Sequence, residues 1–163
     1  MQTAVSSGER AVVGAGSQFT TFHVDNLFFG VDVLKVQEVL RYQEMTRVPL
    51  APAVVRGLIN LRGQIVTAID MRRRLNLTPR GDASALMNIV VRFGDEAVSL
   101  LVDEIGDVLE VEAERFERRP DNVDAEIREL IQGIYKLNDK LLLVLDIGKT
   151  IAPVANEVRG ARK

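Results

Sequence analysis

Apolar and polar residues alternate along much of the chain, and this alternation predicts short β-strands separated by tight turns. In residues 18–24, Phe22 and Val24 fall on one face and Thr21 and His23 on the other. Other segments are also predicted to be strands, and some of them are apolar on both faces. They are residues 27–31, 57–61, 64–70, 86–93, 97–102 and 141–145. Strands this short and this closely spaced are typical of a β-sandwich or a β-barrel.

A few segments break this pattern and predict short helices. Residues 33–40 have apolar side chains three and four positions apart, and Asp32 before them is a suitable N-cap. Asp70 and Asp146 are expected to cap two more helices, the last of which extends to about residue 152. Residues 126–131 predict one further helical turn, whereas residues 115–125 read as a polar surface loop.

The sequence contains a faint internal repeat. Residues 55–70 resemble residues 131–146, with the pairs Gly57/Gly133 and Asp70/Asp146 in register. In the same way, residues 36–40 resemble residues 105–109. Because self-similarity of this kind indicates two related structural units, the chain is expected to contain two small barrels.

The repeat also suggests a domain organisation. We expect one domain over residues 18–155, with a first barrel at about 18–78, a second at about 84–146 and a short C-terminal helix at about 146–152. Neither half carries enough apolar residues for a comfortable core of its own, so the two are expected to share one hydrophobic interface. Residues 1–17 and 156–163 are expected to be tails.

Composition excludes several classes of protein. The 163 residues carry a formal net charge of −2, which argues against nucleic-acid binding. There is no cysteine, so disulfides and thiolate chemistry are excluded and a reducing compartment is compatible. No apolar run is long enough to cross a membrane, and the N-terminus does not resemble a secretory signal. A cytoplasmic location without direct membrane insertion is therefore expected.

The sequence offers little for catalysis. His23 is the single histidine and falls on the outer face of a predicted strand, without a partner for a metal site or a nucleophile–base pair. Asp25, Asp32 and Glu38 each have an ordinary structural explanation. The run Arg72–Arg74 is expected to be a solvated helical turn rather than a ligand site. We therefore predict a non-enzyme without cofactor or metal.

Five short segments resemble the CheW family of bacterial chemotaxis coupling proteins. They are residues 33–38 (VLKVQE), 46–49 (TRVP), 57–63 (GLINLRG), 70–72 (DMR) and 102–109 (VDEIGDVL). The resemblance covers about residues 18–152. It implies a mainly β fold of two intertwined, SH3-like, five-stranded barrels with a few short helices. Thr67 departs from the family pattern, which usually has proline there, but threonine suits a strand.

The resemblance further implies a scaffold rather than an enzyme. Such proteins bind the cytoplasmic hairpin tips of chemoreceptors through the groove between the barrels. They also bind the regulatory domain of the histidine kinase CheA through the barrel ends, and further CheW copies are possible partners in array rings. Recruitment to membrane receptor arrays would then depend on protein partners.

The resemblance assigns receptor binding to Val36, Glu38 and Arg62, and it makes Val108 a candidate for kinase binding. The residues themselves leave structural explanations open, because Val36 could belong to the core and Glu38 could pair with Arg41 along a helix. Arg62 could simply be a solvated turn residue. However, Arg62 lies beside the turn residue Gly63, where packing is minimal.

Two other functions remain open from the sequence. One is coupling in a non-flagellar chemosensory pathway, which would use the same fold. The other is a small-ligand-binding β-barrel, which would require a polar cluster facing a pocket. A kinase regulatory fragment of a larger protein is not favoured, since the chain begins with Met1 and has short tails.

Overall fold

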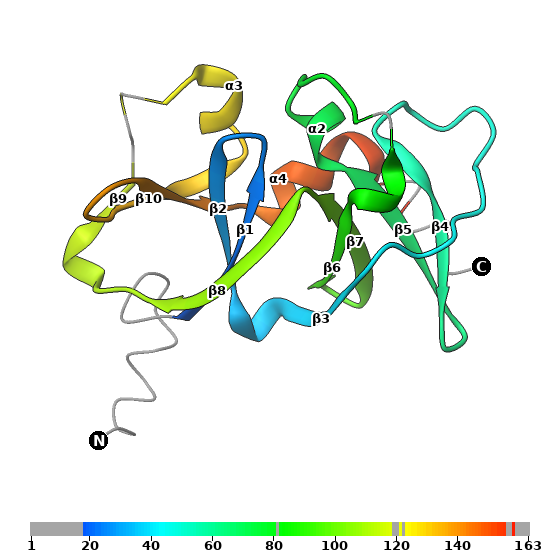
Figure 1. Cartoon of the computed structure of the whole chain (residues 1–163), viewed down its shortest axis with the longest axis horizontal. Coiled ribbons are helices and arrows are strands. Elements are labelled where there is room, and N and C mark those ends of the chain that lie inside the picture. Colours follow the sequence, from blue (N-terminus) through cyan, green and yellow to red (C-terminus); the bar gives the residue numbers. More distant parts are fainter. Residues whose placement is uncertain (1–17, 81, 119–120, 122, 156–157, 159–163) are drawn as a thin grey trace.

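The computed structural model describes residues 18–80, 82–118, 121, 123–155 and 158 (Figure 1). The predicted tails, residues 1–17 and 156–163, therefore lie outside the described residues, with the exception of Val158. That side chain is buried in the main apolar core.

One sheet has five strands in the order β3-β6-β7-β5-β4. All neighbours in this sheet are antiparallel except β5 and β7, which run parallel. The strands are β3 (Val36–Leu40), β4 (Val55–Leu61), β5 (Gln64–Asp70), β6 (Met87–Phe93) and β7 (Glu96–Val102).

The other sheet has six strands in the order β8-β1-β2-β11-β10-β9. Here too a single pair, β2 with β11, is parallel. The strands are β1 (Gln18–Val24), β2 (Leu27–Asp32), β8 (Glu104–Glu110), β9 (Phe116–Glu117), β10 (Ile131–Lys136) and β11 (Leu141–Leu145).

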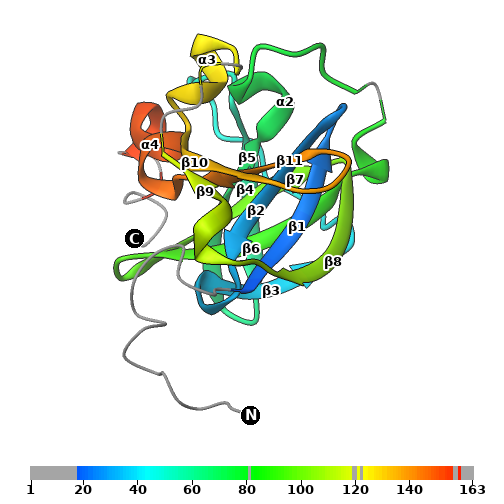
Figure 2. The ribbon, with the colours of Figure 1, turned by 90° about the vertical axis from the view of Figure 1, so that its left-hand side faces the viewer.

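The two sheets exchange strands between the halves of the chain (Figures 1 and 2). The hairpin β1–β2 comes from the first half but pairs with β8 and β11 of the second half, while β6–β7 pairs with β3 and β5 of the first. Both sheets follow the same order when β1, β2 and β8 are matched with β6, β7 and β3. The predicted internal repeat is thus visible as a repeated topology. The sheets do not follow the sequential division at residues 78–84.

Three apolar clusters explain why the halves stay together. The largest is shared, because it contains Phe22 and Phe29 from the six-stranded sheet and Ile89 and Leu100 from the five-stranded sheet. The opposite faces of the sheets bury separate clusters, one for each sheet. Each sheet is therefore covered on both faces, which is the arrangement of two barrels packed on a common core.

Local chemistry confirms the predicted helix starts. Helix α2 (Met71–Arg74) begins after Asp70, whose Oδ1 accepts hydrogen bonds from the amides of Arg72 and Arg73. Helix α4 (Ile147–Ile151) begins in the same way after Asp146, which accepts from the Lys149 amide, and it is followed by a 3₁₀ turn, η4 (Ala152–Val154). The remaining short elements are α3 (Ala125–Arg128), η1 (Val33–Lys35), η2 (Ala83–Ala85) and η3 (Ala113–Arg115).

The repeated glycines are needed for close backbone approach. A Cβ on Gly57 would lie 2.7 Å from the carbonyl oxygen of Thr46, and a Cβ on Gly133 would lie 2.6 Å from that of Glu117. Both glycines follow a β-bulge in equivalent strands, β4 and β10. Any larger residue would push away the neighbouring chain, which explains why glycine occupies both repeated positions.

The predicted helix over residues 33–40 was wrong. Asp32 does cap a turn, but η1 is a single 3₁₀ turn and Val36–Leu40 forms strand β3. A β-bulge between Val36 and Glu38 shifts the alternation of side chains by one position. The apolar spacing then imitates the period of a helix, although the residues are extended.

The predicted loop over residues 115–125 is also partly wrong. Phe116–Glu117 forms strand β9 and extends the second sheet to six strands, where five were expected in each barrel. The ring of Phe116 lies 5.0 Å from that of Tyr135, so an apolar contact holds this short strand. The helical turn expected over residues 126–131 is present one residue earlier, as α3.

Tyr135 lies fully buried in the core of the six-stranded barrel, with its ring 5.6 Å from Phe19. Its hydroxyl has no hydrogen-bond partner among the described residues. Burial raises the pKa of Tyr135 from 10.0 to about 12. The neutral phenol is thus held in an environment that opposes its ionisation.

We expect Tyr135→Phe to raise the free energy of unfolding by about 1 kcal/mol, because an unpaired buried hydroxyl is removed. In the wild type, the contribution of Tyr135 to the free energy of unfolding is constant below pH 10.0. As the pH rises from 10.0 towards about 12, the tyrosine ionises in the unfolded chain before it does so in the folded protein, and the free energy of unfolding falls. This part of the alkaline loss should disappear in the variant. Urea unfolding at several pH values measures both effects, with Tyr42→Phe as the control, and a lower midpoint for Tyr135→Phe would contradict the assignment.

Candidate functional site

Strand β3 forms an outer edge of the five-stranded sheet, since its ladder partner in that sheet is β6 alone. Two buried polar side chains of the neighbouring strands hold its end. The Asn88 side-chain amide donates to the carbonyl of Arg41 at 3.1 Å, and the Ser99 hydroxyl donates to Asn88 Oδ1 at 2.7 Å. The edge is therefore anchored from within the sheet.

The β4–β5 turn directs Arg62 towards this edge. Arg62 and Gly63 have positive φ values of 52° and 91°, the conformation of a type I′ hairpin turn. Asn60 supports the turn because its Oδ1 accepts a hydrogen bond from the Gly63 amide at 2.9 Å. The hairpin predicted around Arg62 and Gly63 is confirmed.

Glu38 and Arg62 form an ion pair between β3 and the hairpin tip. The Arg62 side chain is 72% exposed and that of Glu38 is 20% exposed, so both charges remain accessible from solvent. A second contact, from Gln37 Nε2 to Gln64 Oε1 at 3.2 Å, joins the same two segments. Of the sequence-predicted residues, Glu38 and Arg62 are thus brought together, and the alternative partner for Glu38, Arg41, is not used.

Two exposed apolar side chains lie near this ion pair along the chain, and the alternation of side chains places Val39 on the opposite face of β3 from Glu38. Val39 follows Glu38 on β3, and Ile65 lies near the start of β5 beside the hairpin turn; both are more than one-third exposed. Neither residue was singled out from the sequence. For Val39 the reason is the helical interpretation of residues 33–40, which gave the wrong faces, whereas Ile65 fell in a correctly predicted strand without a sign that it is exposed. The apolar and charged side chains at this edge will be called the β3 patch, defined by Glu38, Val39, Arg62 and Ile65.

The other two residues predicted from the sequence, Val36 and Val108, lie in different environments and on different sheets. Val36 is half-buried and packs against the shared core, as does its repeat counterpart Ile105. Val108 is 52% exposed on β8, the edge strand of the six-stranded sheet, and its counterpart Val39 is exposed as well. Val36 is therefore half-buried against the core, and its assignment to receptor binding stays a prediction, while Val39 and Val108 supply exposed apolar side chains on the two edges.

The arginine run on α2 differs from the solvated turn predicted for it. Arg73 is exposed, but Arg72 and Arg74 reach across to the other half of the chain. Arg74 donates to the carbonyls of Thr150 and Lys149, at 2.7 and 3.1 Å, and burial lowers its pKa. Arg72 binds the carboxylate of Asp103 through two hydrogen bonds. Local sequence carried no signal for these distant partners.

A second exposed feature is the β3–β4 connection. Leu50 is fully exposed and has a φ of 69°, a strained conformation for a leucine. Pro49 and Pro52 flank it, and a hollow beside the loop is lined by Arg47 and Arg56 among others. Arg56 also pairs with Asp70 at 2.9 Å. The loop thus presents one apolar side chain next to cationic groups.

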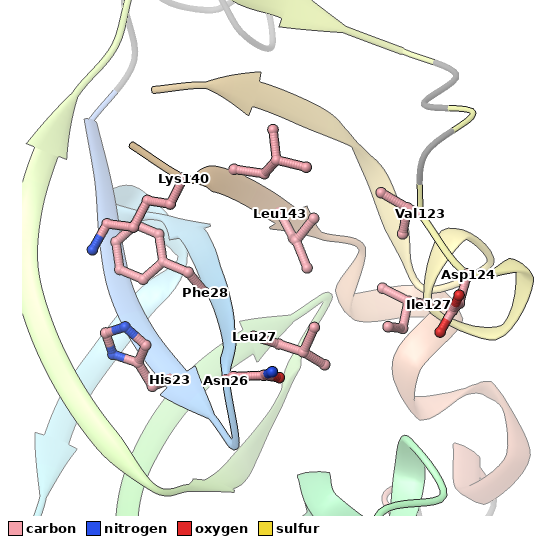
Figure 3. A pocket seen from close by; sticks show the side chains of 10 residues that line it. His23, Asn26, Leu27, Phe28, Val123, Asp124, Ile127, Lys140 and Leu143 are labelled. Atoms are coloured by element: carbon pink, nitrogen blue, oxygen red, sulfur yellow. The ribbon is translucent and has the colours of Figure 1, made fainter. Parts of the chain in front are cut away.

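A pocket of about 370 Å³ lies between the β1–β2 hairpin, the β10–β11 hairpin and α3 (Figure 3). Its apolar wall includes Leu27, Leu143 and Ile127. At one side the rings of His23 and Phe28 lie 4.9 Å apart, and Lys140 Nζ sits 4.0 Å from the centre of the Phe28 ring. His23 therefore takes part in an aromatic and cationic stack, without a nucleophile beside it.

The described residues contain no group of three or more His, Asp or Glu side chains that could hold a metal ion. No helix among them is long and apolar enough to cross a membrane. What the geometry offers is a set of exposed apolar and charged contacts on strand edges, loops and turns. Exposed side chains of these kinds are suited to contacts with other proteins, as in an interaction module.

Comparison with known proteins identifies the family of this module. Residues 18–154 match the model of the CheW-like domain. Chemotaxis protein CheW of Klebsiella aerogenes is 33% identical over 137 residues, which cover 84% of this chain and 82% of that protein. The CheW of Bacillus subtilis is 31% identical over 136 residues, covering 83% and 87%.

A solved structure agrees with these sequence matches. The scaffolding protein TtCheW of Thermoanaerobacter tengcongensis has a TM-score of 0.73 at 27% identity, covering 80% of this chain and 89% of that one. The chain belongs to the CheW-like family, and the predicted mainly β, CheW-like fold is confirmed.

Proposed function

We propose that this chain is a chemotaxis adaptor that couples chemoreceptors to a CheA-type histidine kinase, and that it is not an enzyme. The observation that carries the proposal is the match of residues 18–154 to the CheW-like domain, supported by relatives named chemotaxis protein CheW. The protein-binding character of the exposed sites is consistent with this role.

The receptor is proposed to bind at the β3 patch. A helical hairpin presents rows of apolar and charged side chains, and the β3 edge with the β4–β5 turn carries exposed side chains of both kinds. Val39 and Ile65 would supply apolar contact area, while Glu38 and Arg62 would fix the register of the receptor helices. Because the two charges already form a pair, a partner can bind without leaving either one buried and uncompensated.

The kinase is proposed to bind at the barrel ends. The β3–β4 connection, which carries Leu50, and helix α3, which lines the pocket, lie towards opposite ends of the long axis of the molecule (Figure 1). Leu50 can insert into an apolar pocket of a partner barrel, and the pocket lined by Ile127 can accept an apolar side chain. Val108 remains the sequence-based candidate for a third contact with the kinase.

Membrane recruitment would follow from these contacts alone. An adaptor without a membrane-spanning helix in its described part can reach receptor arrays by binding the receptors themselves. Other copies of the same chain are proposed as additional partners in array rings, where they would occupy the positions of kinase regulatory domains.

Co-sedimentation with receptor-containing membranes tests the adaptor role. Purified chain, CheA-type kinase and membranes from the same organism are combined, and kinase autophosphorylation is followed. We expect the kinase to pellet only when this chain is present and its activity to become receptor-controlled. If the chain binds neither partner, the adaptor proposal fails.

Charge reversal of the ion pair tests the receptor site. Arg62→Asp should leave the fold intact, because an exposed pair of this kind contributes at most about 1 kcal/mol to stability. Receptor binding should fall by about tenfold, the effect of losing ~1.4 kcal/mol of interface energy. Arg118→Asp, an equal charge change at an exposed site just after β9, serves as the control.

The exchanged double variant Glu38→Arg with Arg62→Glu separates the two possible roles of the pair. It rebuilds an ion pair between β3 and the hairpin but presents the charges to the receptor in reverse. Receptor binding should therefore stay weak although circular dichroism and thermal melting look native. Full recovery of receptor binding would mean that the ion pair only holds the β4–β5 hairpin against β3 and that its charges do not contact the receptor.

Leu50→Glu tests the kinase site. The substitution places a carboxylate where an apolar contact is proposed, so kinase binding should weaken by about tenfold or more while receptor binding is retained. Leu34→Glu is the matched control, because Leu34 is a similarly exposed leucine on η1. Equal loss of kinase binding in both variants would rule out a specific role for Leu50.

A further inference from the structure

One ion pair joins four segments of the chain at the boundary between the two sheets. Asp103 lies where the chain leaves β7 of the five-stranded sheet and enters β8 of the six-stranded sheet. Arg72 lies on α2, which directly follows β5 of the five-stranded sheet. The β1–β2 turn and residue Thr78, which follows α2, complete the cluster.

The contacts of this cluster are directional and close. Arg72 Nε donates to Asp103 Oδ1 at 3.0 Å, and its Nη2 donates to Asp103 Oδ2 at 2.7 Å. Its third nitrogen, Nη1, donates to the carbonyl of Thr78 at 2.9 Å. The amide of Asp25 donates to Asp103 Oδ2 at 2.6 Å, and the amide of Asp103 donates to the carbonyl of His23 at 2.9 Å. Two sheets are thus tied through one carboxylate.

Electrostatics agree with a tightly held pair. The side chains of Arg72 and Asp103 are only 16% and 7% exposed. Burial opposes ionisation of Asp103, but the hydrogen bonds from Arg72 and the Asp25 amide outweigh it and lower the pKa of the carboxyl. The hydrogen bond to Asp103 likewise raises the pKa of Arg72, against the opposing effect of its burial.

Such a pair is better suited to fixing geometry than to adding stability. The attraction of two buried charges is largely offset by the loss of their hydration, whereas a two-pronged contact between guanidinium and carboxylate permits one orientation. The shared apolar core provides cohesion, but the hydrophobic effect is not directional. A directional polar contact at the boundary can therefore restrict the orientation of one sheet relative to the other.

We propose that Arg72 and Asp103 are positioning residues that fix the orientation of the two barrels and thereby align the partner-binding edges. Strand β8, which carries Val108, begins directly after Asp103, while the β3 patch lies on the other sheet. Loosening the pair changes the relation between these edges without removing any residue from either. The link to coupling rests on the proposed adaptor function; the link to barrel orientation does not.

Distance measurements on the full chain test the orientation directly. The sequence has no cysteine, so spin labels attach only at introduced sites. Asp95→Cys with Asp139→Cys places one label on each sheet, at the exposed β6–β7 and β10–β11 turns. Asp95→Cys with Arg41→Cys places both labels on the five-stranded sheet and reports whether that sheet itself stays intact.

Arg72→Lys is the decisive variant, because it keeps the charge and loses the two-pronged contact. Asp103→Asn, nearly identical in shape, gives a second route to the same loss should one variant fold poorly. Arg73→Lys is the matched control, an equal change at the next position, whose ion pair with Asp70 lies within one half of the chain.

We expect Arg72→Lys and Asp103→Asn to broaden the distance distribution between the sheets and to leave the distribution within the sheet unchanged. Arg73→Lys should alter neither. Wild-type distributions in both test variants would overturn the proposal. Equal broadening within and between the sheets would also overturn it, since that result means general loosening of the fold.

A second readout concerns coupling. Arg72→Lys should bind receptor alone and kinase alone as the wild type does, while the yield of the complex containing both partners falls several-fold. An undiminished yield would overturn the link between barrel orientation and coupling. If the wild-type chain binds neither partner, the adaptor proposal fails, and the distance measurements still decide the role of the ion pair.

Discussion

The exchange of strands around one shared apolar core is the constraint on which the rest of this structure depends. Hairpin β1–β2 pairs with strands of the second half, and β6–β7 with strands of the first. Neither half can therefore complete its sheet or cover its apolar face alone. Folding of one barrel requires the other, and the free edges β3 and β8 are fixed as a consequence.

Edges created in this way are suitable places for protein contacts. The core residues of every strand are committed to burial, so variation is restricted to edges, turns and connections. The ion pair at the β3 edge places polar groups where an unpaired strand would otherwise attract other strands. The Leu50 loop belongs to such a connection too, and the Leu50 side chain is fully exposed. The residues that form the core are thus different from the residues that are available for binding.

Local and repeated features could be predicted from the sequence. The hairpin at Arg62, the helix caps at Asp70 and Asp146 and the close approach at Gly57 and Gly133 depend on neighbours in sequence or on the repeat. Strand β3 could not be predicted, because its bulge removes the alternation that identifies strands. The structural role of Arg72 could not be predicted for another reason. Its partner Asp103 is distant in sequence, and three successive arginines are typical of a solvated surface.

The repeat also shows where function departs from scaffold. Counterparts that serve the fold are retained, as in the helix caps Asp70/Asp146 and in the half-buried pair Val36/Ile105. Counterparts at the two hairpin turns differ, since Arg62 corresponds to the uncharged Asn138. A symmetric scaffold would offer two equal surfaces, whereas an adaptor between two unlike partners requires unequal ones. Changing side chains at edges and turns while keeping the paired backbone achieves this without disturbing the shared core.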